Sequence, residues 1–301
     1  MFLIVPIIVI SLIEFRLGII PNSYSIKKDC LEKNQRKLKV LILGTSQANY
    51  ALNPQVFDQN GCNIANSNQD LYFDKKLLEI YIQKLPNLQT VIIPVTYFSL
   101  EFKLSNTDEA WRQFFYKRWF NISPPDNSIE DRLNIKNWSY LALYGPRTSW
   151  GFLYHGLDFS LADNNNEHGW FASPKTSLDD SKGKQRANLH TSEMREEYLN
   201  QNRNNLRQMI ELLQNKNIRP IVVIIPVTKN YLQNIDQLKW VREQETLNEI
   251  IENSNLTLFN FMSDDRFTTS DFADGSDHLN IQGASKFSNI LRDAIQSEKT
   301  P

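Results

Sequence analysis

A serine stands directly after the first apolar run of the chain. Ser46 lies in Gly-Thr-Ser-Gln, residues 44–47, and follows the apolar residues 38–43. In open α/β sheets ligands bind beyond the carboxyl ends of the strands, and a serine at that place can begin a helix whose backbone N–H groups favour a developing negative charge. Serine is also a common helix cap, so the position alone does not separate a nucleophile from a structural residue.

A histidine near the C-terminus provides the base that a serine nucleophile requires. His278 lies within residues 271–284, Asp-Phe-Ala-Asp-Gly-Ser-Asp-His-Leu-Asn-Ile-Gln-Gly-Ala. The base takes the serine proton, and a carboxylate fixes the tautomer of the base. Two acids are available, Asp274 and Asp277. We prefer Asp274, because a side chain adjacent to the histidine usually points elsewhere, and Asp277 stays an alternative. Together with Ser46, this motif indicates acyl-ester chemistry through an acyl-serine intermediate.

The elements that must position these residues alternate along the chain. Short apolar runs at 38–43, 90–95, 220–227 and, more weakly, 256–261 predict strands, and segments at 74–85, 196–217 and 235–252 have helical spacing. Strands that alternate with helices of this length predict an α/β fold with a parallel sheet covered on both faces, a three-layer sandwich.

These motifs resemble those of the SGNH (GDSL-like) hydrolases. The first block of that family places a serine in a Gly-Asp-Ser-like turn after strand one, and the last block carries Asp-x-x-His near the C-terminus. Residues 41–47, Leu-Ile-Leu-Gly-Thr-Ser-Gln, are similar to the first block, and the residues around His278 are similar to the last. The resemblance spans about 38–295 apart from an insertion. It implies a flavodoxin-like fold, a Ser-His-Asp triad and no metal or cofactor.

Within the superfamily the chain looks most like membrane-tethered bacterial proteins, including the D-alanyl lipoteichoic acid transfer proteins. This resemblance implies an ester hydrolase or O-acyltransferase that acts on acyl groups of a cell-surface glycan or on another small ester. It also implies a catalytic domain outside the cytoplasm and a multi-spanning acyltransferase as a partner.

Three departures from the family pattern bear on activity. Gly275 occupies the position expected for the triad acid, three residues before His278. The second-block glycine, an oxyanion-hole donor, has no counterpart in residues 63–69, where the backbone N–H of Ser67 or Asn68 is the available substitute. The third-block asparagine is missing from residues 94–99. Losing one such donor costs on the order of 10²–10³ in rate. The alternative is therefore a catalytically inactive module that binds glycan or scaffolds an envelope-polymer pathway.

An aromatic-rich segment interrupts the alternation between about residues 99 and 190. It contains five of the six tryptophans, at positions 111, 119, 138, 150 and 170. We interpret the segment as an insertion with its own small core, which is compatible with a lid or a sugar-binding wall. At its end lies His190, which either faces the cleft and contacts substrate or is a structural histidine.

The N-terminus predicts a membrane anchor. Residues 2–13 are apolar without a break, and the apolar character continues to residue 20 apart from Glu14 and Arg16. A bilayer-spanning helix needs about 20 apolar residues, so 1–20 is interpreted as an anchor, 21–37 as a linker and 38–301 as the catalytic domain. A signal peptide is the competing interpretation, without a basic lead-in or small-residue cleavage site. The basic residues of the linker favour a cytoplasmic body, so the orientation is open.

The composition excludes several classes of protein. There are 33 basic and 34 acidic residues and no basic stripe or zinc-finger spacing, which argues against nucleic-acid binding. No glycine-rich phosphate loop follows the first predicted strand, which argues against a dinucleotide binder. The only cysteines, Cys30 and Cys62, have no His or Cys neighbours that would complete a metal site. We expect two unpaired thiols, with a disulfide as the alternative for a domain outside the cytoplasm.

Overall fold

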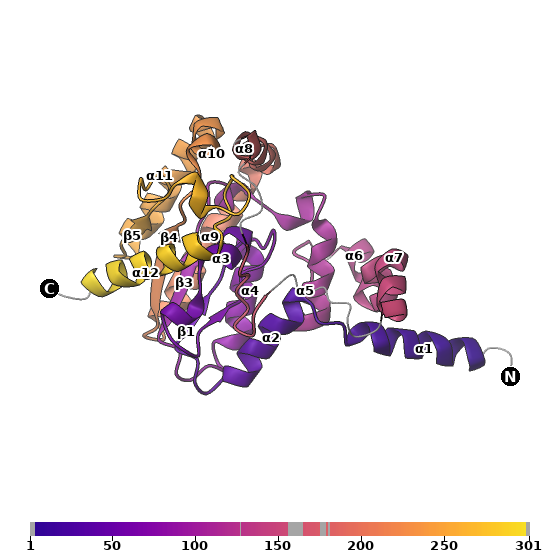
Figure 1. Ribbon diagram of the computed structural model, residues 1–301. Coiled ribbons are helices and arrows are strands. Elements are labelled where there is room, and N and C mark those ends of the chain that lie inside the picture. Colours follow the sequence, from indigo (N-terminus) through magenta and orange to yellow (C-terminus); the bar gives the residue numbers. More distant parts are fainter. Residues whose placement is uncertain (1–3, 127, 156–164, 175–178, 180, 299–301) are drawn as a thin grey trace.

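The core of the molecule is a parallel β-sheet of five strands. The computed structural model describes residues 4–126, 128–155, 165–174, 179 and 181–298 (Figure 1). The strands are β1 (Val40–Ile42), β2 (Cys62–Asn63), β3 (Thr90–Pro94), β4 (Arg219–Ile224) and β5 (Leu258–Asn260), in the order β2-β1-β3-β4-β5. Every neighbouring pair is parallel. This is the strand order of flavodoxin-like doubly wound sheets, and the predicted parallel α/β architecture is confirmed.

Alternation along the strands sorts their side chains into two hydrophobic cores. One core contains Leu41, Val91, Ile93, Val222 and Ile224, and the other contains Val40, Ile42, Ile92, Ile221 and Val223. Successive residues of a strand point to opposite faces, which explains this division. The first core is completed by α4 (Leu71–Tyr81), α9 (Leu199–Gln214) and α11 (Gln237–Asn253), and the second by α3 (Ser46–Ala51) and α12 (Ile281–Glu298). The result is the three-layer sandwich that the sequence predicts.

The segment expected to be a linker is a helix. Within residues 21–37, α2 (Ser23–Asn34) begins at Asn22, whose side chain accepts hydrogen bonds from the backbone N–H groups of Tyr24 and Ser25. Its buried Lys27 donates to Asn49 Oδ1, Asn165 Oδ1 and the Gly169 carbonyl, each at 3.0 Å. The linker prediction is wrong because the polar appearance of this segment comes from a capping motif and from a lysine that is buried with three acceptors.

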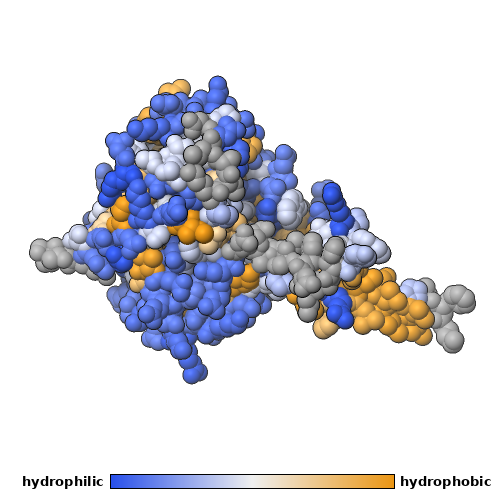
Figure 2. Space-filling model, viewed as in Figure 1, coloured by the Kyte–Doolittle hydropathy of each residue, from blue (hydrophilic) through white to orange (hydrophobic). Residues whose placement is uncertain are grey.

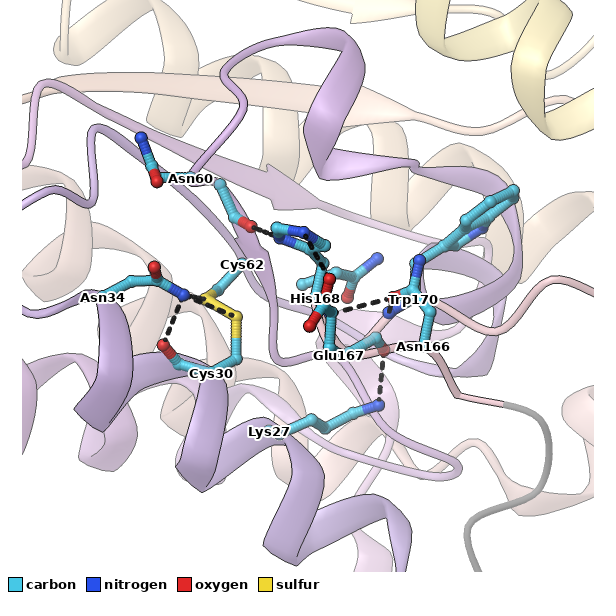
Figure 3. The surroundings of a disulfide bond; sticks show 12 residues. Lys27, Cys30, Asn34, Asn60, Cys62, Asn166, Glu167, His168 and Trp170 are labelled. Atoms are coloured by element: carbon cyan, nitrogen blue, oxygen red, sulfur yellow. Dashed lines mark hydrogen bonds and ion pairs between the residues drawn. A yellow bond between two sulfur atoms is a disulfide. The ribbon is translucent and has the colours of Figure 1, made fainter.

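Cys30 and Cys62 form a disulfide between α2 and β2 (Figure 3). Their Cα atoms are 6.1 Å apart, and 32 residues separate them in sequence. The expectation of two unpaired thiols is therefore wrong. The two-residue strand β2 is too short to show a periodic pattern in sequence, so nothing in the sequence places Cys62 next to Cys30.

Helix α1 (Ile4–Gly18) occupies the place of the predicted anchor. It has 15 residues, which corresponds to about 22 Å at 1.5 Å per residue. Across the described residues, no helix has both the length and the apolar character needed to cross a membrane. The spanning helix expected within residues 1–20 is accordingly not found there. Residues 1–3 lie outside the described part.

Short helices fill the expected insertion between β3 and α9. They are η2 (Ser99–Glu101), η3 (Leu104–Asn106), η4 (Ala110–Arg112), α5 (Gln113–Phe120), α6 (Ile129–Leu133), η5 (Ile135–Asn137), α7 (Tyr140–His155), α8 (Ser181–Glu193) and η7 (Glu196–Tyr198). The rings of Phe115 and Tyr116 stack on Tyr24 and Phe73 with centroid separations of 4.8 and 4.0 Å. The aromatic residues of α5 thus extend the main core. The remaining short helices are η1 (Pro54–Val56), α10 (Lys229–Asn234) and η8 (Thr269–Asp271).

Candidate active site

Ser46 is the first residue of α3, directly beyond the carboxyl end of β1. The chain turns at Gly44, which has φ of 113° and whose N–H donates to Asp74 Oδ1 at 2.9 Å. A side chain at this left-handed position is strained, and a Cβ would come within 3.1 Å of Ala48. Thr45 then caps α3 by accepting from the Gln47 N–H at 3.3 Å. Because β1 and β3 are neighbours at the point where the strand order reverses, Ser46 lies at the switch point where such sheets bind ligands.

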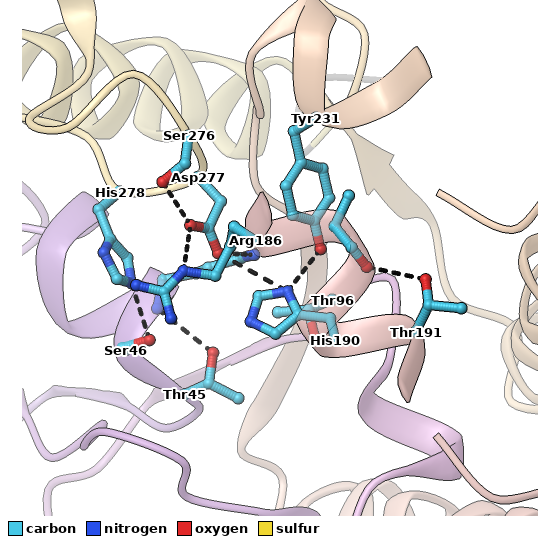
Figure 4. Close-up of polar contacts among 12 residues, drawn as sticks. Thr45, Ser46, Thr96, Arg186, His190, Thr191, Tyr231, Ser276, Asp277 and His278 are labelled. Carbon is cyan, nitrogen blue, oxygen red and sulfur yellow. Dashed lines mark hydrogen bonds and ion pairs between the residues drawn. The ribbon is translucent and has the colours of Figure 1, made fainter. Parts of the chain in front are cut away.

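His278 reaches Ser46 from the loop before α12. Its Nε2 lies 2.9 Å from Ser46 Oγ, a hydrogen-bond distance (Figure 4). The imidazole stacks on the ring of Tyr50 at 4.2 Å, and the His278 carbonyl accepts from the Ala273 N–H at 2.8 Å. The two residues that the sequence singles out are 232 positions apart and meet in the fold.

Asp274 is the acid that faces the other nitrogen of the imidazole. Its Oδ2 lies 3.7 Å from His278 Nδ1, while its Oδ1 accepts from the N–H and the hydroxyl of Ser276 at 3.1 and 2.6 Å. Burial raises the pKa of Asp274, but the hydrogen bonding and charge of His278 and the donors of Ser276 outweigh burial and hold it well below its usual range. Gly275, with φ of 77°, forms the turn that lets an acid four residues before the histidine fold back onto it.

Asp277 faces a different set of partners. Its fully buried carboxylate accepts from Gln47 Nε2 at 2.9 Å, and Ser276 Oγ and Arg186 Nε lie 2.9 and 3.6 Å away. Burial raises the pKa of Asp277, but the electrostatic interactions with His278 and Arg186 and the Gln47 hydrogen bond lower it below its usual value. Asp277 is therefore an ionised group that ties α3 and α8 to the loop. Of the two acids, Asp274 has the position of a triad acid.

His190 lies next to Asp277 and forms no hydrogen bond with Ser46. Its Nδ1 is 2.7 Å from the hydroxyl of the buried Tyr231 and 4.0 Å from Asp277 Oδ2, and its ring packs on Phe98 at 4.1 Å. Burial lowers the pKa of His190 to about 4, against the opposing effect of Asp277. The ring is consequently neutral at neutral pH. This environment is that of the structural histidine, one of the two interpretations that the sequence leaves open.

The residues expected to form the oxyanion hole are not both free to do so. The Ser67 N–H already donates to Asn66 Oδ1 at 3.0 Å, so Ser67 is unsuited to the expected role. Asn68 has a left-handed backbone with φ of 54°, and its N–H donates no hydrogen bond to another of the described residues. The amide nitrogen of buried Asn66 has no hydrogen-bond partner among the residues described here, which makes it a donor that the sequence pattern did not indicate.

Two further residues of the site have no sequence signal. Gln47 follows Ser46 and is buried, and Arg186 extends from α8 with about a third of its side chain exposed. Figure 4 shows the Arg186 guanidinium directed toward Thr45 and Ser46 while its Nε faces Asp277. Neither residue belongs to a motif, since only the fold brings α8 to the loop. Within the described ranges, no cluster of three or more His, Cys, Asp or Glu residues could hold a metal ion.

Comparisons with known proteins add little to this geometry. No family model and no curated protein matches the chain. Among solved structures, a GDSL-like lipase from Bacteroides thetaiotaomicron VPI-5482 is similar, with 10% sequence identity and a TM-score of 0.39, over 89% of this chain and 90% of that one. At this level of similarity the match carries no argument about activity. The site has to be interpreted from its own residues.

Proposed function

We propose that the chain is a serine-dependent ester hydrolase or O-acyltransferase of the SGNH type. The observation that carries the proposal is the 2.9 Å contact between Ser46 Oγ and His278 Nε2 at the carboxyl edge of the sheet. A nucleophile and a base within hydrogen-bond reach, with a carboxylate behind the base, form the minimal unit of acyl transfer. The 3.7 Å separation of Asp274 and His278 suits a resting site, because catalytic hydrogen bonds often shorten only when substrate binds.

The reaction follows from this arrangement in two halves. Ser46 Oγ attacks the acyl carbonyl carbon while His278 Nε2 takes the hydroxyl proton, and the resulting tetrahedral intermediate loses the alcohol, which receives that proton. The acyl group is then an ester of Ser46. Water or an acceptor hydroxyl, deprotonated by His278, then attacks the acyl carbon; the bond from that carbon to Ser46 Oγ breaks, and His278 returns the proton to Oγ. Water as the acceptor gives hydrolysis, and a sugar hydroxyl gives transfer.

The proposed setting is the outer face of a membrane, with O-acyl groups of a cell-surface glycan as substrate. The Cys30–Cys62 disulfide supports a compartment outside the cytoplasm, because disulfides persist in oxidising environments. The apolar α1 supports attachment to a membrane. The resemblance to D-alanyl lipoteichoic acid transfer proteins suggests a multi-spanning acyltransferase as the partner that supplies or receives the acyl group.

A second candidate function is a catalytically inactive module that binds glycan or scaffolds an export complex. The observation that favours it is the occupied Ser67 N–H, which removes one of the two expected backbone donors of the oxyanion hole and leaves Asn68 as the other. In this case the Ser46–His278 pair would have no catalytic role.

A fluorophosphonate probe, which labels activated serines, separates the two functions. We expect the full chain to be labelled, and the Ser46→Ala and His278→Ala variants to lose the label. Ser67→Ala is the matched control, because it removes a neighbouring hydroxyl that has no role in the proposed reaction. Folded wild-type protein that takes up no label would favour the inactive module.

A further inference from the structure

Exposed apolar side chains point in every direction around α1 as far as Phe15, and Arg16 is exposed in its last turn. Ile4, Val5, Ile7, Ile8, Val9, Ile10, Leu12 and Phe15 are each between 48% and 69% exposed. At about 100° per residue these positions are distributed around the whole helix, and the widest empty sector is about 100°. Figure 2 shows the helix as a hydrophobic projection from a largely hydrophilic body. A protein partner that docks on one face would leave the other faces in water, whereas lipid surrounds a helix completely.

The base of α1 is packed rigidly against α7. Leu17, Ile20 and Phe152 form a small buried cluster, and a Cβ at Gly18 would come within 2.8 Å of the Tyr140 ring. Glu14 accepts from the Ser139 hydroxyl at 2.5 Å and from the Tyr140 N–H at 2.6 Å, at the N-terminus of α7. The one acidic residue of α1 is therefore used as a helix cap. Helix α7 thus lies beside the last turns of α1, next to the turns that are exposed all round.

One face of α7 carries three large side chains that are substantially exposed. Trp150 is 70% exposed, Leu153 41% and Tyr154 76%, and their i, i+3, i+4 spacing places them on one face. Phe152, which packs on α1, points to the opposite side and is 2% exposed. Tryptophan and tyrosine are enriched at membrane–water interfaces, where an apolar ring with a polar edge is favoured.

We propose that α7 is a second membrane contact, in which Trp150, Leu153 and Tyr154 lie in the headgroup layer beside the point where α1 enters lipid. The proposal rests on the membrane attachment through α1 proposed above. It adds that two helices contact the bilayer, α1 in the acyl-chain region and α7 in the headgroup layer. One helix in lipid leaves a domain free to swivel, whereas a second contact at the interface fixes its orientation.

Single fluorescent labels on the full chain test this proposal. Because Cys30 and Cys62 are paired, an introduced cysteine is the sole thiol. Val9→Cys, Trp150→Cys and Tyr154→Cys report on the two contacts, and Leu238→Cys on α11, at a residue that is 83% exposed, is the matched control. Each labelled chain is mixed with vesicles of phosphatidylethanolamine and phosphatidylglycerol that carry nitroxide quenchers either in the headgroup or in the acyl chain.

We expect loss of fluorescence at position 9 with the acyl-chain quencher, loss at positions 150 and 154 with the headgroup quencher, and none at position 238. If position 9 is quenched while positions 150 and 154 behave like 238, the α7 contact is wrong and the attachment through α1 stands. If position 9 is not quenched, both are wrong. A chain that is dimeric without lipid, with the label at position 9 already shielded, would identify a second copy as the occupant and also overturn the proposal. None of these outcomes depends on catalysis.

Discussion

The loop around His278 and helix α1 differ in how far their side chains are satisfied by contacts within the chain. At the sheet edge the polar groups of Ser46, Asp274 and Asp277 all have partners within the chain. On α1, eight large apolar side chains are each about half or more exposed. The contacts of the candidate active site lie within one chain, whereas the exposed side chains of α1 and α7 are the ones assigned to the proposed membrane contact. The candidate active site and the surface formed by α1 and α7 can therefore be tested independently.

The largest effect is expected at the triad acid. Asp274→Asn should lower turnover of an ester substrate about 10⁴-fold, because the amide can no longer hold His278 in the required tautomer. Asp277→Asn should cost no more than about 10²-fold, through small displacements of Gln47 and the loop. Steady-state kinetics on both variants measures the contrast. Equal losses would mean that the two carboxylates act as one unit.

The next largest effect concerns the covalent link between α2 and β2. Replacing both cysteines, Cys30→Ser with Cys62→Ser, should lower the free energy of unfolding by about 3–4 kcal/mol, as expected for a loop of 32 residues. Denaturant unfolding with and without reductant measures the loss. Reductant should destabilise the wild-type chain by a similar amount and leave the double variant unchanged. A wild-type chain indifferent to reductant would show that the link contributes little.

The buried neutral His190 should make the chain sensitive to acid. With a pKa of about 4 in the folded state and 6.5 as the ordinary value, only the unfolded chain takes up this proton between those limits. Stability is thus lost as the pH falls from 6.5 toward 4, by about 2 kcal/mol at pH 5. Buried Asp74, with its pKa raised by burial to about 7, acts in the opposite direction, so the comparison must be with His190→Gln. The stability difference between wild type and variant should shift in favour of the variant on acidification. A pH-independent difference would contradict the neutral assignment.

The smallest effect is expected at the polar contact of α1. Glu14→Gln should weaken the cap on α7 by about 1 kcal/mol, because a neutral acceptor interacts less favourably with a helix N-terminus. Faster hydrogen exchange at the amides of Tyr140 and Leu141 would report the change. Glu32→Gln, which removes an exposed ion pair with Lys28, is the control and should have little effect. Unaltered exchange in Glu14→Gln would mean that apolar packing alone holds α7.

The core of the fold was predictable because it depends on local patterns. Apolar runs of strand length and amphipathic helical spacing identify β1, β3, β4 and the helices that cover them. Ser46 and His278 were predictable for a similar reason, since each lies in a short recognisable motif at a known place in such a fold. By contrast, β2 has two residues and no period, so the pairing of Cys62 could not be read from the sequence.

The rest of the site depends on contacts between distant segments. Gln47 meets Asp277 across 230 positions, and Arg186 reaches the loop from an insertion without a regular pattern. The choice between Asp274 and Asp277 needed the left-handed turn at Gly275, which spacing alone does not reveal. The loss of the Ser67 donor follows from a side-chain orientation at Asn66.

The disulfide between Cys30 and Cys62 also restricts where Ser46 can lie relative to α1. A flexible linker between α1 and the sheet would let the domain adopt many positions relative to α1. Instead α2 follows α1 after a few residues and is bonded to β2, beside the strand that leads to Ser46. If α1 lies in lipid, Ser46 would be held at a nearly constant distance from the membrane surface. In the proposed reaction, an acyl donor or acceptor would have to be presented at that distance, and this requirement would restrict which substrates can react.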